Sequence, residues 1–97
     1  MRIITPKQRK INESWSKITQ DKIRELNGVC QFCERVNSDI PFDFLSGHHI
    51  VKRRYGIHTR ENHYLMHYWS CHLFVEEHNI DVRIYPTRSA WEAEVGH

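Results

Sequence analysis

Residues 47–72 read GHHIVKRRYGIHTRENHYLMHYWSCH, and most of the expected fold follows from this stretch. Its β-branched and alternating segments predict two short strands, at residues 49–51 and 62–66. The segment between them is basic and contains Gly56, which is typical of a loop. Residues 69–78 place their apolar side chains at helical spacing. The sequence therefore predicts two strands followed by a helix.

The residues before this stretch predict a helix over residues 5–27. Thr5 and Pro6 are typical of a helix start, and Asn27-Gly28 is typical of a helix end. Apolar residues recur between them at helical spacing. This pattern fits either one long helix or two helices with a break near Thr19.

The remaining segments flank the predicted strands and helix. Residues 29–46 contain many turn-forming residues and are expected to be irregular. Residues 80–85 predict a strand, and residues 87–95 predict a short terminal helix capped by Thr87 or Ser89. Together these elements predict a small α+β domain with flanking helices.

The composition indicates one soluble domain, residues 1–97. Mean hydropathy is −0.68, and no apolar run is long enough to span a bilayer. The three tryptophans, Trp15, Trp69 and Trp91, are expected in the core. The first residues lack the apolar segment of a signal peptide, so we expect a cytoplasmic protein with reduced cysteines.

The charge is unevenly distributed along the chain. Lys and Arg outnumber Asp and Glu by seven to three in residues 1–30 and by five to three in residues 31–60. In residues 61–97, Asp and Glu outnumber Lys and Arg by six to two, which leaves an overall net charge of +2. A basic first half is compatible with a surface that faces a polyanion.

The three cysteines and one histidine have the spacing of a closed metal site. Cys30 and Cys33 form a Cys-x2-Cys pair, which lets two thiolates of one turn bind the same tetrahedral zinc ion. Cys71 is the third thiol, and His67 lies four residues before it, so both side chains would share one helical face. We predict a structural zinc ion bound by these four residues. A redox pair would open a helix after a strand, whereas this pair enters a turn-rich loop.

The order of these motifs resembles that of the HNH endonucleases. After Cys-x2-Cys the chain has His48-His49-Ile50-Val51, then Glu61-Asn62, and then Cys71-His72. The resemblance covers residues 28–79, and Gly47 before the first histidine is similar to a subgroup common in phages. It implies a ββα-metal (His-Me finger) fold with a zinc knuckle. It also implies DNA phosphodiester hydrolysis with one divalent cation, which could be Mg²⁺, Mn²⁺, Ni²⁺ or Zn²⁺, and a protein partner in phage DNA processing.

The resemblance also implies roles for single residues. His49 resembles the general base, and Asn62 resembles the asparagine that holds the loop orienting that base. His48 and His72 resemble ligands of the catalytic cation. Glu76 lies four residues after His72, on the same helical face, and is a further candidate ligand.

Two differences from the family pattern leave alternatives open. Members with Gly-His-aromatic-Ile place their histidine at the position of His48, so the base is either His48 or His49. Common members have Cys-x2-Cys where this chain has His67 and Cys71, with one residue more between the ligands.

The residues between the predicted strands indicate how DNA would be bound. Four basic side chains would lie beside the predicted catalytic residues and contact DNA phosphates. They are Lys52, Arg53, Arg54 and Arg60. Low sequence specificity is expected because the chain has no separate reading domain. The alternative function is a non-catalytic zinc-finger module that binds nucleic acid or a protein, which would not need the catalytic histidines and asparagine.

Overall fold

A two-stranded antiparallel hairpin lies at the centre of the fold. The computed structural model describes residues 4–95, and in it strand β1 (Leu45–His49) pairs with strand β2 (His63–His67). Neighbouring residues of a strand point to opposite faces. The adjacent residues His48 and His49 of β1 therefore face different sides of the hairpin.

The first strand lies earlier than predicted. The expectation of a strand over residues 49–51 was wrong for Ile50 and Val51, which follow the strand in bends. The side-chain amide of Asn62 accepts a hydrogen bond from the Val51 N–H at 2.6 Å and donates one to the Val51 carbonyl at 3.0 Å. Because the Val51 N–H already donates to Asn62, it cannot donate to a neighbouring strand. The second strand, in contrast, begins one residue later than predicted, directly after Asn62.

Helix α1 (Pro6–Glu25) is one continuous helix. The Thr5 side chain caps its start by accepting a hydrogen bond from a backbone N–H of the first turn at 3.1 Å. The chain leaves the helix through Gly28, whose φ of +73° suits a residue without a side chain. The hydroxyl of Thr19 donates to the carbonyl of Trp15 at 3.0 Å within the helix, and no break occurs there.

The chain passes directly from β2 into a wide helical turn. Residues Tyr68–His72 form the π-helical turn η3, and helix α2 (Leu73–Glu77) follows it. The carboxylate of Asp43 accepts hydrogen bonds from two backbone N–H groups of η3, at 2.6 and 3.1 Å, and so caps this turn from a distant segment. The helix predicted over residues 69–78 is present, with a π-helical first turn.

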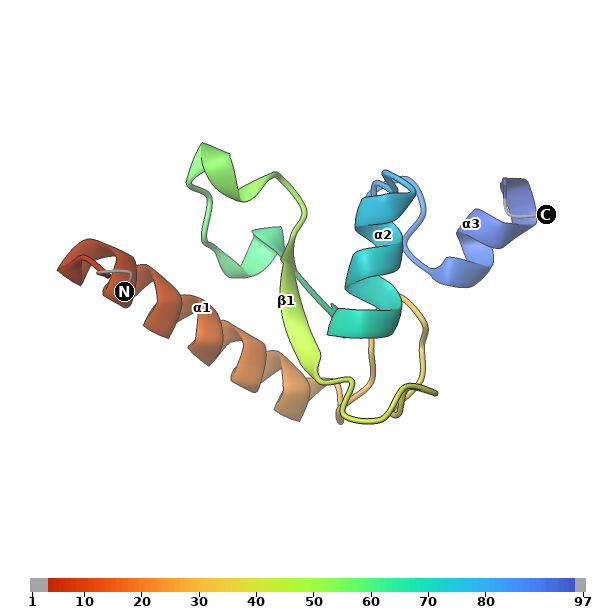
Figure 1. Cartoon of the computed structure of the whole chain (residues 1–97), viewed down its shortest axis with the longest axis horizontal. Coiled ribbons are helices and arrows are strands. Elements are labelled where there is room, and N and C mark those ends of the chain that lie inside the picture. Colours follow the sequence, from red (N-terminus) through yellow and green to blue (C-terminus); the bar gives the residue numbers. More distant parts are fainter. Residues whose placement is uncertain (1–3, 96–97) are drawn as a thin grey trace.

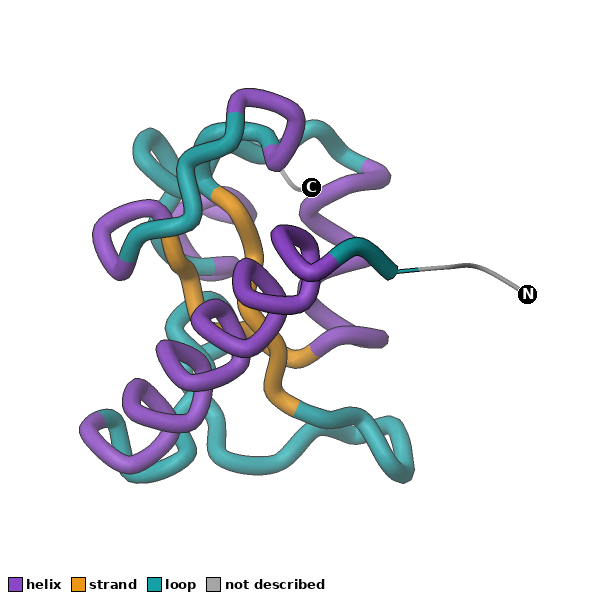
Figure 2. The backbone as a smooth tube through the Cα atoms, turned by 90° about the vertical axis from the view of Figure 1, so that its left-hand side faces the viewer, coloured by secondary structure: helices purple, strands orange, loops and turns teal. Residues whose placement is uncertain are grey.

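Helical segments cover both faces of the hairpin. Figure 1 and Figure 2 show α1 crossing one face, while α2 lies on the other side of β1. Helix α3 (Arg88–Glu94) follows at the far end and is capped by Thr87. None of the helices within residues 4–95 has the length and apolar character needed to cross a membrane. The buried core joins β2 to the η3–α2 segment, and its residues are Cys30, Phe32, Met66, Cys71, Val75, Ile80 and Val82.

Residues 80–85 contain a turn at residues 82–84 and no strand, so the strand predicted there was wrong. The carbonyl of Asp81 accepts hydrogen bonds from the N–H groups of Ile84 and Tyr85, both at 2.9 Å. These bonds stay within the segment, which therefore does not extend along the hairpin. Its buried residues Ile80 and Val82 enter the core from irregular backbone and a turn instead.

The three tryptophans have different environments. Trp91 packs against the core, as predicted, and Trp15 is half-buried between α1 and β1. Trp69 is 48% exposed, so its predicted place in the core was wrong. Trp69 lies on the solvent-exposed side of η3, whereas Cys71 is the residue of this turn that is buried in the core.

Candidate functional site

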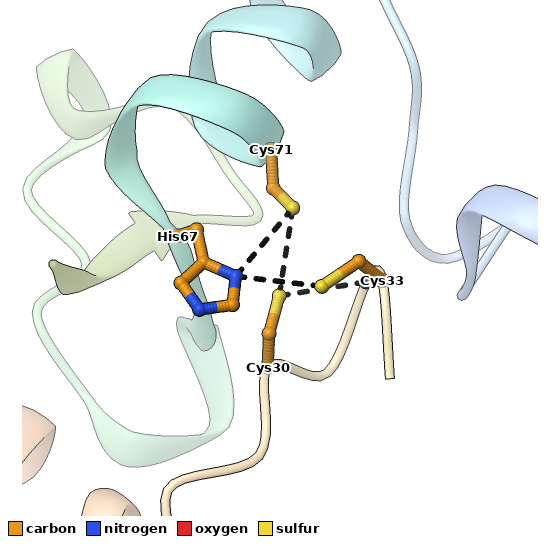
Figure 3. A group of neighbouring side chains, drawn as sticks. All are labelled: Cys30, Cys33, His67 and Cys71. Carbon is orange, nitrogen blue, oxygen red and sulfur yellow. Dashed lines mark hydrogen bonds between the residues drawn. The ribbon is translucent and has the colours of Figure 1, made fainter. Parts of the chain in front are cut away.

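Four side chains that could bind one metal ion come together beside the hairpin (Figure 3). Cys30 and Cys33 come from the loop after α1, His67 ends β2, and Cys71 lies in η3. Their ligand atoms all lie within 4.8 Å of one another. Cys33 is half-buried and the other three residues are buried. The group is therefore a closed Cys3His cluster within the core.

His67 reaches this cluster from a strand. The prediction placed His67 and Cys71 on one helical face, but His67 has an extended backbone with φ −61° and ψ 137°. The wide turn η3 then brings Cys71 back, so that its Sγ lies 4.0 Å from Nδ1 of His67. The predicted pair thus meets across a strand-to-turn junction.

Hydrogen bonds hold the cysteine loop against β2. The N–H of Gln31 donates to the carbonyl of Leu65 at 2.8 Å, and the Gln31 side-chain oxygen accepts from the N–H of Leu65 at 2.8 Å. The N–H of Cys33 also donates to Sγ of Cys30 at 3.4 Å. Because Leu65 belongs to β2, these bonds fix the cysteines relative to the strand that ends at His67.

Two distances within the cluster are close to those around a tetrahedral zinc ion, and the third, of 4.0 Å between Cys71 and His67, is somewhat longer. Sγ of Cys30 lies 3.6 Å from Sγ of Cys71, and Sγ of Cys33 lies 3.4 Å from Nδ1 of His67. Zinc–sulfur bonds of about 2.3 Å and zinc–nitrogen bonds of about 2.0 Å require tetrahedral separations of about 3.8 and 3.5 Å. The sulfur separation is too long for a disulfide, whose bond is about 2.05 Å.

The ring of His67 is oriented by its other nitrogen. Nε2 lies 3.2 Å from the carbonyl oxygen of Val36, so a proton on Nε2 leaves the Nδ1 lone pair directed at the sulfurs. The thiols also affect one another. The hydrogen bond between Cys30 and Cys71 lowers the pKa of Cys30 to about 5, while the same contact and burial raise the pKa of Cys71. A thiolate at Cys30 is the form that binds metal.

A second group of possible ligands lies on the other side of the same turn. Nδ1 of His48 lies 3.2 Å from Nδ1 of His72 and 3.6 Å from Oε1 of Glu76. His48 is buried, whereas the side chain of Glu76 is 60% exposed. Burial and the neighbouring His72 lower the pKa of His48, which favours the neutral imidazole that binds metals. Because Cys71 and His72 are consecutive, η3 contributes one side chain to each group.

His49 lies on the opposite face, against α1. Its ring stacks on the indole of Trp15, with centroids 3.8 Å apart and planes within 4°. Nε2 of His49 lies 3.1 Å from Nδ1 of His58, so Nδ1 of His49 is the ring nitrogen that this contact does not use. Burial, and then the neighbouring His58 and Arg53, lower the pKa of His49 to about 4. The His49 ring is therefore neutral near pH 7.

Gly47 allows α1 to approach β1 closely enough for this stack. A Cβ at this position would overlap the ring of His63 and would lie 2.7 Å from Nε1 of Trp15. In its absence, Nε1 of Trp15 donates to the carbonyl of Gly47 at 3.4 Å. A side chain at residue 47 would thus move α1, and Trp15 with it, away from His49.

Asn62 holds the loop that follows β1. It is buried, and besides its two hydrogen bonds with Val51 it donates to the carbonyl of Ile57 at 2.8 Å. These bonds link both ends of the segment that contains the basic loop, which is defined here as residues 52–54. Asn62 therefore fixes this loop relative to the end of β1.

One cavity of about 1070 Å³ contains most of the predicted site residues. Those in its lining are His48, His49, Lys52, Arg53, Arg54, His72 and Glu76. Arg60 is not among the lining residues, and its guanidinium instead pairs with Glu25. His78, a further histidine at the end of α2, does not line the cavity either, and its ring stacks on Trp91 with centroids 5.1 Å apart.

Several residues of the cavity were not predicted as site residues. Among them are Trp15, Phe44, His58, Tyr68 and Arg83. Trp15 was expected in the core because its spacing in α1 is helical. His58 lies in a loop without periodicity, and the only signal for it is a further histidine nine residues after His49.

Comparison of the chain with protein-family models, curated proteins and solved structures finds no match. No family is therefore identified. The geometry supports a small α+β fold in which a β-hairpin is followed by a helix. It also supports a Cys3His cluster that could bind a metal ion and a separate histidine–glutamate group.

Proposed function

We propose that the chain is a metal-dependent DNA endonuclease whose fold is stabilised by a structural zinc ion. The observation that carries the proposal is the presence of two unlike ligand groups on one turn. The group at Cys71 is buried and has four ligands, whereas the group at His72 has three and borders the cavity. Structural zinc sites are closed by four protein ligands, and catalytic metal sites keep an open position.

The open group would hold a divalent cation. His48, His72 and Glu76 offer two imidazoles and one carboxylate, a mixed donor set that suits zinc or nickel as well as manganese or magnesium. A cation bound there would supply Lewis-acid chemistry toward a phosphate oxygen and the leaving oxygen. The burial of His48 fixes one side of the group, and the exposure of Glu76 leaves the other side accessible.

His49 would be the general base of this reaction. Its neutral ring can accept a proton from an attacking water. If its Nε2–H donates to His58, the Nδ1 lone pair is available for that proton. The stack with Trp15 holds the plane of the ring, and Asn62 holds the backbone that follows β1.

The basic loop would bind the phosphates beside the scissile bond. Lys52, Arg53 and Arg54 are exposed and line the same cavity as the histidines. Contacts of this kind position a nucleic acid without reading its bases, which agrees with low sequence specificity.

The alternative is a zinc module that binds nucleic acid or a protein without cleaving it. This function would explain the Cys3His cluster, but it gives no role to the open group or to His49. Nicking of a supercoiled plasmid with Mg²⁺, Mn²⁺ or Ni²⁺ distinguishes the two. We expect wild type and the control His78→Ala to nick, and His49→Ala to be about 10²–10⁴-fold slower. A wild-type protein that binds zinc but nicks with none of these cations would favour the binding module.

A further inference from the structure

One end of the cavity is aromatic, and the proposed cleavage does not use it. The rings of Phe44 and Tyr68 are nearly parallel, with centroids 5.2 Å apart and planes at 11°. Tyr68 is in turn nearly parallel to His72, with centroids 5.5 Å apart and planes at 17°. All three rings line the cavity, and Phe44 is 55% exposed. A row of rings therefore leads from the surface to the open ligand group.

Backbone contacts hold this row in place. The N–H of Tyr68 donates to the carbonyl of Phe44 at 2.9 Å, which extends the hairpin pairing beyond β1. The adjacent Asp43 binds the N–H groups of Trp69 and Ser70. These bonds fix the backbone at Phe44 and Tyr68, so little conformational freedom would be lost when a ligand binds their rings.

The other end of the cavity is positively charged. Phe44 directly precedes β1, and the basic loop follows it, so the strand that carries His48 and His49 lies between the two ends. Five strand residues at about 3.3 Å each separate these ends by about 16 Å. A volume of about 1070 Å³ is at the upper limit of small-molecule pockets. These dimensions favour a segment of a polymer that carries phosphates at one end and a flat ring at the other.

We propose that Phe44 is a stacking platform for an unpaired nucleobase, and that the substrate is DNA with single-stranded or locally unpaired nucleotides beside the cut. This inference rests on the proposed function and specifies its substrate class. An aromatic face accepts any base, whereas a base inside a duplex must leave its stack to reach one. Phe42 is 95% exposed but is not among the residues that line the cavity, so it provides a matched control.

The test uses two labelled single strands of equal length, one an oligothymidylate and one made of abasic sites. Both carry the same phosphates, and fluorescence anisotropy is measured on the zinc-loaded full chain without added Mg²⁺ or Mn²⁺. Wild type should bind oligothymidylate about fivefold or more tightly than the abasic strand. Phe44→Leu should lose this preference by weakening only oligothymidylate binding. Phe44→Trp and Phe42→Leu should keep the preference.

Two results would overturn the inference. One is equal binding of both strands by wild type, a comparison that needs no variant. The other is a preference in Phe44→Leu that equals the preference in Phe42→Leu, with both variants melting as wild type does. Plasmid nicking separates this inference from the proposed function. Nicking that depends on His49, together with either overturning result, would reject only the substrate class, whereas absence of both binding and nicking would reject the endonuclease itself.

Discussion

The two ligand groups differ in their surroundings, although η3 contributes a side chain to each. Cys71 lies in the core, and its partner His67 is fixed from behind by the carbonyl of Val36. His72, the next residue, borders the cavity together with the exposed Glu76. Burial favours a structural ion that stays bound, whereas solvent access favours an ion that can exchange and contact a substrate. The consecutive residues Cys71 and His72 thus belong to two ligand groups that differ in their access to solvent.

The largest expected difference is in folding. Cys30→Ala should abolish zinc binding and remove most of the folded population. Structural zinc contributes about 10–16 kcal/mol, which is comparable to the whole stability of a domain. His72→Ala should melt close to wild type, because the side chain of His72 is only half-buried and borders the cavity. Thermal melting followed by circular dichroism measures both, and equal melting of the two variants would contradict the distinction between the groups.

The next difference separates the two adjacent histidines. His49→Ala removes the proposed base, so nicking should fall about 10²–10⁴-fold at every Mn²⁺ concentration. His48→Ala removes a proposed ligand, so its nicking should recover in part as Mn²⁺ is raised. A Mn²⁺ titration of plasmid nicking measures this. Recovery of His49→Ala but not of His48→Ala would exchange the two roles.

A smaller effect is expected at Asn62, which fixes the segment that contains the basic loop. Asn62→Ala removes three hydrogen bonds, so the N–H and carbonyl of half-buried Val51 and the carbonyl of Ile57 lose their partner. The free energy of unfolding should fall by about 1–3 kcal/mol. Zinc content should stay at the wild-type value while nicking falls. Loss of zinc in this variant would mean that the two regions are not independent.

The smallest effect is expected in the basic loop. Arg53→Glu combined with Arg54→Glu should flatten the slope of log affinity against log salt by about 2, because each phosphate contact contributes about 0.9. Arg60→Glu is the matched control, since Arg60 pairs with Glu25 and is not among the cavity residues. Equal slopes for wild type and the double variant would mean that the loop does not contact DNA.

The order of the long first helix, the two hairpin strands and the later helices could be predicted from the sequence, but the ends of β1 and the turns at residues 80–85 could not. Helix caps and apolar periodicity are local signals, and they located α1 and α3 closely. The end of β1 is set by the side chain of Asn62, which is distant in sequence from Val51. The π-helical form of η3 was not predicted either. A π-helical turn holds one residue more than an ordinary α-helical turn, so Cys71 lies in a wider turn than the helical spacing from His67 implied.

The site could be predicted only in part for the same reason. Spacing alone indicated the four members of the Cys3His cluster, although the expected common helical face was wrong. His58 and Phe44 carry no spacing signal, because they reach the cavity through loops. Trp15 carried a signal for the core, and only the close approach at Gly47 places it on His49.

The central claim is that one ion stabilises the fold while another supports cleavage. It is tested most directly by measuring zinc content, melting and plasmid nicking in one preparation dialysed against a weak chelator. About one zinc per chain should remain, and melting should be unchanged. Nicking should be lost and should return when Mn²⁺ is added. Loss of zinc, fold and nicking together at a single chelator concentration would contradict the account, as would nicking that persists after dialysis without any added cation.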